Sequence, residues 1–432
     1  MWGTHWTTKL EKRGVPAVYI VDEPFVEDTQ ITCEKEGMPL LRRVIVPHTC
    51  GEIPDERLPE IMPELVDALT TALTEEEKKT GIIKPTKVPR IAFTGTLDEV
   101  QNYFDIRFWT DGLPIVPPTE KKVIEMLNRT SHSPDEVVST MWPEGWTATV
   151  EKVAISGVMA GCKPAYMPVL LAIVEAFGKG AFSSGVRSTN SFSFPILVNG
   201  PIAKEIGMNS GINALGSSTG NKANATIGRF LRLAIINLGG SVSGVNDMSS
   251  QGNPSKYSFA FTENTERSPW EPFHVSMGYK PKDSVVSIFS GGWSHLGNHS
   301  KLDLIAKGIA KFEWPNGITL LIDPMVARSL AKKGYSKKDV EEYIWENATE
   351  TMGEFKARKY YSQFIERILK GKSMYGEKYL WPKHYLNLPD DAVVQVYPRK
   401  YVKAVVVGGE TNPFVQAWKF AYPSMVSVDK WR

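Results

Sequence analysis

Cys162 is the residue whose surroundings are most typical of reactive chemistry. It lies in an apolar stretch, Val153–Gly178, directly before Lys163, Pro164 and a helix expected from Ala165 to Phe177. Proline suits the first turn of a helix, because its missing N–H would be unpaired there. The free N–H groups and the helix dipole favour a thiolate at such a position. The alternative is a buried cysteine that packs as a small hydrophobic residue.

Three further residues have the types needed for proton transfer. Asp111 lies in the stretch TDGLPIVPPT, where Asp-Gly and three prolines predict a rigid, extended loop that would fix the carboxylate in place. Lys256 and Glu263 lie on short strand-like pieces and suit a general acid and base. Such a pair is also common as a structural ion pair.

A glycine-rich loop, residues 216–222, precedes a helix expected over residues 224–238. Backbone N–H groups at a helix start bind small anions, so a carboxylate is the expected ligand if the loop is a site. The alternative is a flexible loop before a core helix. The phosphate-binding pattern GxxxxGK[ST] is absent from this loop. The candidate substrate-binding residues are Asn199, Lys222, Asn224, Arg229, Asn264 and Trp270, of which Lys222 and Arg229 supply positive charge.

Histidines give a weaker signal. His295 and His299 are four apart, and His274 lies upstream. The glycines around the pair argue against the helix that would place both rings on one face, and there is no HExxH motif. We therefore expect no metal site.

The composition bounds the class of protein. A net charge of +2 in 432 residues, 42% of them hydrophobic, gives no reason to expect a nucleic-acid or membrane partner. The N-terminus lacks the apolar region of a signal peptide, so a cytoplasmic location is expected. The three cysteines, Cys33, Cys50 and Cys162, are too few and too scattered for a disulfide framework.

The pattern predicts an α/β fold in two domains. Residues 1–95 alternate strand (17–22), helix (24–37), strand (40–48) and helix (58–79), as in a small doubly wound module. This module is too short for a complete sheet, so a partner or the rest of the chain would complete it. Residues 96–432 are expected to form a larger, loop-rich α/β domain that carries the site. Its expected elements are strands at 194–198, 318–322 and 404–407 and helices at 121–128, 324–333, 336–349 and 354–370.

Two parts of the chain resemble a known family. EKRGVPAVYIVDEPF and GMPLLRRVIVPH resemble the module that follows the cysteine or selenocysteine motif in UGSC-family (seleno)proteins, with a more distant similarity to the selenoprotein subunits of glycine and sarcosine reductases. TDGLPIVPPT, VMAGCKPAYMPV and GNPSKYSFAFTENTERSPW resemble the domain that accompanies such modules. The resemblance implies thiol or selenol chemistry. The U/C-G-S-C motif itself is absent, so it is either lost or carried by a partner chain.

Three functions follow from these observations. The first is an enzyme, or a subunit of one, that uses Cys162 on a small, anionic organic substrate, with Asp111, Lys256 and Glu263 as proton-transfer or orienting groups. The second is a lyase or hydrolase that uses Lys256 and Glu263 in the same pocket while Cys162 is structural. The third is a non-catalytic partner of a cysteine or selenocysteine protein. A homo- or hetero-oligomer is expected, and the sequence leaves the cofactor unknown.

Overall fold

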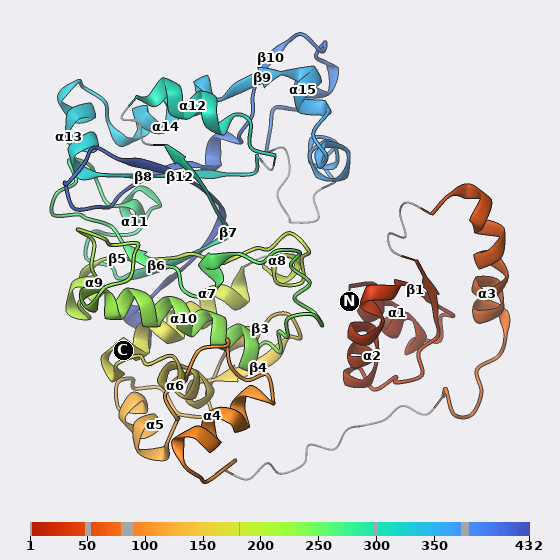
Figure 1. The fold of residues 1–432 in the computed structure, drawn as a ribbon. Coiled ribbons are helices and arrows are strands. Elements are labelled where there is room, and N and C mark those ends of the chain that lie inside the picture. Colours follow the sequence, from red (N-terminus) through yellow and green to blue (C-terminus); the bar gives the residue numbers. More distant parts are fainter. Residues whose placement is uncertain are drawn as a thin grey trace. The chain divides into compact units, whose positions relative to one another are not determined.

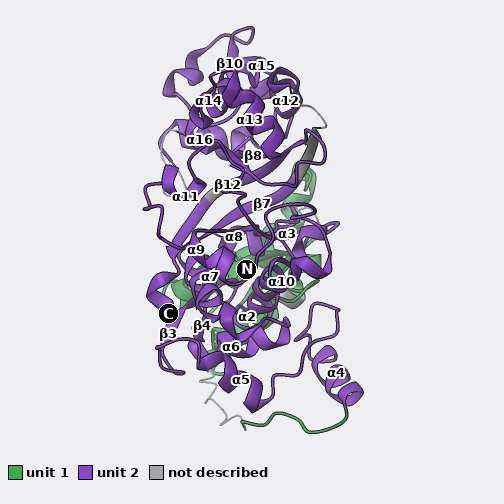
Figure 2. Cartoon of the chain, turned by 90° about the vertical axis from the view of Figure 1, so that its left-hand side faces the viewer, with its two compact units in different colours: residues 1–96, 242–248 green, residues 97–241, 249–432 purple. Residues whose placement is uncertain are grey.

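The computed structural model describes most of the chain, in seven segments: residues 2–47, 53–78, 90–180, 182–297, 301–313, 315–372 and 380–432. The chain divides into two compact units, shown in different colours in Figure 2. One comprises residues 1–96 and 242–248, and the other comprises residues 97–241 and 249–432. No helix among the described residues is long and apolar enough to cross a membrane.

The smaller unit contains the expected strand–helix–strand–helix order. Its two strands pair in parallel, with Val21 beside Ile45. The last helix ends earlier than its apolar pattern predicts, because the Arg42 guanidinium binds the carbonyls of Ala68, Thr71 and Ala72 at that end. The elements are α1 (Trp2–Glu11), β1 (Tyr19–Asp22), α2 (Val26–Lys35), β2 (Arg43–Val46) and α3 (Leu58–Thr70).

The first part of the larger unit is built around α7 (Met167–Lys179), a helix that is apolar on all sides. Its residues from Met167 to Phe177 are buried, including Glu175, whose carboxylate binds Lys179, Lys430 and the Trp431 indole. The other elements in this part are α4 (Leu97–Asp105), α5 (Glu120–Leu127), β3 (Val137–Met141), β4 (Trp146–Thr149), α6 (Val150–Met159), α8 (Ser183–Val186), α9 (Pro201–Glu205) and α10 (Lys222–Asn237). Of these, β3, α6 and α10 pack against α7.

A six-stranded mixed sheet in the order β11-β8-β12-β7-β5-β6 forms the centre of this unit. β5 pairs in parallel with β6 and β8 with β11, while β7 and β12 run antiparallel to each other and to β5 and β8, respectively. The strands are β5 (Ile196–Asn199), β6 (Ala260–Thr262), β7 (Val285–Gly297), β8 (Ile318–Ile322), β11 (Val402–Val406) and β12 (Val415–Ser427).

β7 and β12 together form a long two-stranded ribbon. At one end Val286 pairs with Val426, and at the other Val415 pairs with Gly297. β5 joins the ribbon on the β7 side at the first end, and β8 joins it on the β12 side at the second. Each end of the ribbon therefore carries its own parallel pair of strands.

The sheet curls so that its two ends face each other. One apolar cluster contains both Leu197 and Phe289 from the β5 end and Leu321 and Val405 from the β8 end. The Asn264 N–H donates to the Val406 carbonyl at 2.7 Å, which joins the segment after the edge strand β6 to the last residue of the edge strand β11. Figure 1 shows α7 and α10 on the β5 side and α12 to α14 on the β8 side.

The remaining helices and one small sheet cover the β8 side. The helix expected over residues 354–370 is interrupted after Lys356, and the Arg358 side chain in the interruption binds Glu350 and the Ala310 carbonyl. The elements are α11 (Phe273–Ser276), α12 (Leu302–Ile309), α13 (Pro324–Lys332), α14 (Lys337–Asn347), β9 (Thr349–Thr351), α15 (Met352–Lys356), a π-helical turn (Tyr361–Ile365), α16 (Glu366–Leu369) and β10 (Val393–Gln395).

Candidate active site

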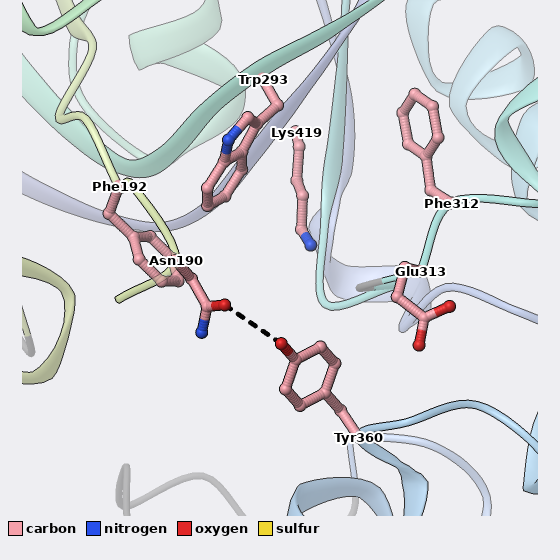
Figure 3. Close-up of a pocket in the computed structure, with 7 residues that line it drawn as sticks. All are labelled: Asn190, Phe192, Trp293, Phe312, Glu313, Tyr360 and Lys419. Carbon is pink, nitrogen blue, oxygen red and sulfur yellow. Dashed lines mark hydrogen bonds between the residues drawn. The ribbon is translucent and has the colours of Figure 1, made fainter. Parts of the chain in front are cut away.

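A pocket of about 290 Å³ opens beside the middle of the β7–β12 ribbon. Its size suits a small organic molecule. Figure 3 shows the Lys419 side chain extending into the space between Trp293, Tyr360 and Glu313. The residues that line the pocket are Asn190, Phe192, Trp293, Phe312, Glu313, Tyr360 and Lys419.

The alternation of side chains along β12 directs Lys419 to the pocket. Its neighbours Trp418 and Phe420 pack with Phe259 on the face of the sheet that lies inside the curl. Successive side chains on a strand point to opposite faces, so Lys419 points away from that cluster. Trp293 is directly opposite Lys419 in the register, and the Lys419 Nζ lies 5.4 Å from the Trp293 ring centroid.

Glycines on β7 make this arrangement possible. The register shifts between Lys419 and Phe420, which leaves Gly292 as an extra residue on β7. Such bulges redirect side chains and are frequent next to active sites. Gly292 has φ +91°, and a Cβ on it would lie 1.6 Å from the Ser193 Oγ. The positive φ and the contact with the Ser193 hydroxyl both favour glycine at this position.

Burial lowers the pKa of Lys419 well below its usual value. Only 6% of the residue is exposed, and removing an ammonium group from water disfavours its charged form. The positive charge of Arg358 lowers the pKa further, while Glu313 raises it. The Trp293 ring also favours the ammonium form. Because desolvation is the largest of these effects, their sum shifts Lys419 toward its neutral form.

A buried ion pair fixes another wall of the pocket. The Arg358 Nε and Nη2 donate to the two Glu350 carboxylate oxygens at 2.7 and 2.8 Å. The same guanidinium also donates to the carbonyls of Ala310 and Phe312. Because Arg358 contacts both groups at once, it holds the turn at Phe312 in place and neutralises Glu350.

Polar groups at the rim add hydrogen-bonding capacity. The Tyr360 hydroxyl donates to the Asn190 Oδ1 at 3.1 Å. The Lys359 backbone N–H donates to the Glu313 Oε1 at 2.9 Å, so this exposed carboxylate is oriented at the pocket. The pocket therefore combines a buried amine, a phenol, a carboxylate and aromatic walls.

Cys162 lies outside this pocket. It follows α6 and precedes α7, close to the helix start that the sequence predicts, but its side chain is buried. The Sγ donates to the Thr226 carbonyl at 3.4 Å. Desolvation raises the pKa of Cys162 to about 12, so the thiol stays protonated at neutral pH. The structure therefore differs from the expected thiolate, because burial outweighs the helix dipole.

Asp111 and Arg229 form a bidentate ion pair with each other. The Arg229 Nε and Nη2 each donate to a carboxylate oxygen of Asp111 at 2.8 Å. The pair ties the proline-rich loop to α10. Each residue neutralises the other, which opposes the separate roles expected for Asp111 in proton transfer and for Arg229 in anion binding.

The glycine-rich loop before α10 is held by its own amides. The Asn224 side chain accepts from the Asn209 N–H and donates to the carbonyls of Asn209 and Ala214. Asn221 donates to the carbonyls of Asn213 and Gly216. Asn224 is thereby engaged within the loop, while Lys222, the first residue of α10, is exposed.

The structure brings Asn199, Glu263 and Asn264 together at the ends of β5 and β6. The Asn199 Nδ2 donates to the Glu263 Oε2 at 2.9 Å, and the Asn264 Nδ2 donates to the Gly408 carbonyl. Burial raises the pKa of Glu263. Trp270 is separate from this cluster and donates to the Tyr335 carbonyl.

Lys256 and Glu263 lie at opposite ends of β6. Lys256 precedes the strand and its Nζ donates to the Ser249 Oγ at 2.7 Å, whereas Glu263 follows the strand. This placement opposes the expected acid–base pair.

Of the three histidines considered for a metal site, His274 is buried and has its pKa lowered by desolvation. The side chain of His295 and the whole of His299 lie outside the described residues, as does Cys50. Among the residues that the structure describes, no three metal-ligating side chains gather in one place.

Sequence reasoning missed every residue of the pocket. They come from five segments that are far apart in the chain. The one local signal is Gly291-Gly292-Trp293, whose glycines are typical of a bulge when they occur inside a strand.

Comparison with known proteins finds a similarity in the first segment of the chain. A family model described as "UGSC family" matches residues 2–75. No curated protein and no solved structure matches the chain. The matched residues include α1 to α3 with the parallel pair β1–β2, in the strand and helix order expected from the sequence. Residues 2–75 are thus similar to the UGSC family, whereas the match does not extend to the larger unit.

Proposed function

We propose that the larger unit is an enzyme domain that acts on a small organic molecule, with Lys419 as general base or nucleophile. The observation that carries the proposal is the position of this amine: it is buried, faces an aromatic ring and lines a cavity. Catalytic lysines are activated in this way, by desolvation next to another cationic group. Arg358 supplies that second cation.

Lysine-based chemistry, which the sequence favours at Lys256, is here assigned to Lys419. Thiol chemistry at Cys162 has weaker support, because its thiol is buried and bonded to the Thr226 carbonyl. The thiol or selenol chemistry implied by the UGSC resemblance would then belong to a partner chain.

Competitive labelling with trace acetic anhydride over a range of pH tests the activation of Lys419. Peptide mass spectrometry reads each lysine separately, with exposed Lys333 as the reference. The midpoint of labelling reports the pKa, even though burial slows the absolute rate. We expect Lys419 to reach half-maximal labelling at a lower pH than Lys333. Equal midpoints would refute an activated amine.

A screen of small carbonyl compounds and organic acids for turnover tests catalysis. Lys419→Met should lower kcat/KM about 10²- to 10⁴-fold, because it removes the proton acceptor or nucleophile with little change of shape. Lys333→Met is the matched control and should leave turnover unchanged. Loss of activity in Lys256→Met but not in Lys419→Met would return the site to β6.

A further inference from the structure

The walls of the Lys419 pocket restrict the substrate more sharply than the amine alone. Four of the seven lining residues are aromatic: Phe192, Trp293, Phe312 and Tyr360. The Phe192 and Trp293 rings meet edge to face, with centroids 4.8 Å apart. Aromatic walls of this kind bind flat rings through stacked or edge-to-face contacts.

The charges at the pocket argue against an anionic ligand. Arg358, whose positive charge lowers the pKa of Lys419, is already bonded to both carboxylate oxygens of Glu350. The Glu313 carboxylate lines the pocket and would repel an anion. An uncharged ring that carries an electrophilic carbon fits these groups better than the small anion expected from the sequence.

We propose that Lys419 forms an imine with an aldehyde or ketone attached to an aromatic ring. The inference rests on the proposed function and names its substrate class. The Nζ lone pair attacks the carbonyl carbon, and the C=O π electrons move to oxygen, which takes up a proton. Nitrogen then loses its protons as the hydroxyl leaves as water, and a C=N bond replaces the C=O bond. No oxidant or reductant takes part.

Tyr360 is placed to supply the proton for the departing hydroxyl. Its own hydroxyl and the Lys419 amine border the same space (Figure 3). The Asn190 Oδ1 accepts from that hydroxyl at 3.1 Å and fixes its direction. Tyr360→Phe should therefore slow formation of the imine while leaving the binding of the ring intact.

Reductive trapping of the full chain tests this chemistry. The protein is incubated at pH 7 with sodium cyanoborohydride and either benzaldehyde or butanal, and adducts are mapped by peptide mass spectrometry. We expect at least a tenfold preference for Lys419 over Lys333 with benzaldehyde, and a weaker preference with butanal. Benzyl alcohol, which has the ring but no carbonyl, should reduce the adduct at Lys419 only.

Two variants complete the test. Lys419→Arg should abolish the selective adduct, because a guanidinium stays protonated and does not form an imine under these conditions. Phe192→Leu should retain the adduct but lose the preference for benzaldehyde. A different outcome is that the yield of adduct at each lysine follows its exposure alone while labelling with acetic anhydride has a lowered pH midpoint at Lys419. That result refutes the imine and leaves the general-base role standing. If the midpoint is ordinary as well, both proposals fail.

Discussion

The ion pair between Asp111 and Arg229 gives the sharpest prediction about stability. Two charge-assisted hydrogen bonds of 2.8 Å join the side chains, of which 2% and 15%, respectively, are exposed. Arg229→Met leaves the buried carboxylate without its cation. Breaking such a pair from one side costs about 3–5 kcal/mol in the free energy of unfolding. At 3 kcal/mol, the unfolding equilibrium constant rises more than a hundredfold.

A double variant measures the interaction between the two side chains apart from the effect of losing either one. In Asp111→Asn/Arg229→Met no charge is left buried, so part of the lost stability should return, with a coupling energy of about 0.5–3 kcal/mol. Guanidinium unfolding followed by circular dichroism measures both variants. Arg399→Met, which breaks an exposed pair with Glu342, is the control and should hardly change the midpoint. A loss below about 1 kcal/mol in Arg229→Met would refute the argument, since surface pairs give as much.

Three further predictions concern a thiol, a helix cap and a histidine. Burial raises the pKa of Cys162 to about 12, so iodoacetamide at pH 8 should label it only as fast as the protein unfolds; labelling at the rate of a free thiol would contradict this. Ser336→Ala removes the capping box of α14 and should lower stability by about 1 kcal/mol in thermal unfolding, while an unchanged melting temperature would argue against the cap. The Lys430 carbonyl and Glu136 raise the pKa of His132, so its stabilisation is complete below an unfolded pKa of about 6.5 and is lost as pH rises through the folded pKa. Wild type should therefore lose more stability than His132→Gln between pH 5.5 and 8, and equal losses would refute the assignment.

Elements with strong local patterns could be predicted from the sequence. The apolar run at Ile318–Ile322 is β8, and Ser336 caps α14 as its position before Lys337 indicates. α/β character follows from the alternation of such segments. These predictions succeed because propensity, capping and burial agree within a few residues.

The long ribbon could not be predicted in the same way. β7 contains Gly291-Gly292, and β12 contains Lys419 and Pro423, all of which are unusual inside a strand. Register shifts beside Lys419 and between Ala421 and Ser424 accommodate these residues. Only pairing between distant segments stabilises them, and single-sequence patterns carry no information about that pairing.

The sites expected from the sequence differ from those in the structure for a related reason. The sequence marks Asp111 by its proline-rich loop and Arg229 by its positive charge near a glycine-rich loop. It does not indicate that they pair, because they are 118 positions apart. The same holds for Cys162, whose exposure depends on the packing of α10 against it. Residue type and spacing indicate which groups are reactive in principle, whereas burial by distant segments determines their charge.

The pairing along the β7–β12 ribbon has a consequence for the number of ligands. A half-turn about an axis through the Phe420–Gly291 pair exchanges the Val286–Val426 pair with the Val415–Gly297 pair, and β5 and β6 with β8 and β11. The order and direction of strand pairing in one chain thus follow the two-fold pattern that two identical subunits form in a dimer. The same half-turn exchanges Lys419 with Ser290, which has no amine. The pattern of strand pairing repeats but the amine does not, so titration should find one imine-forming site per chain.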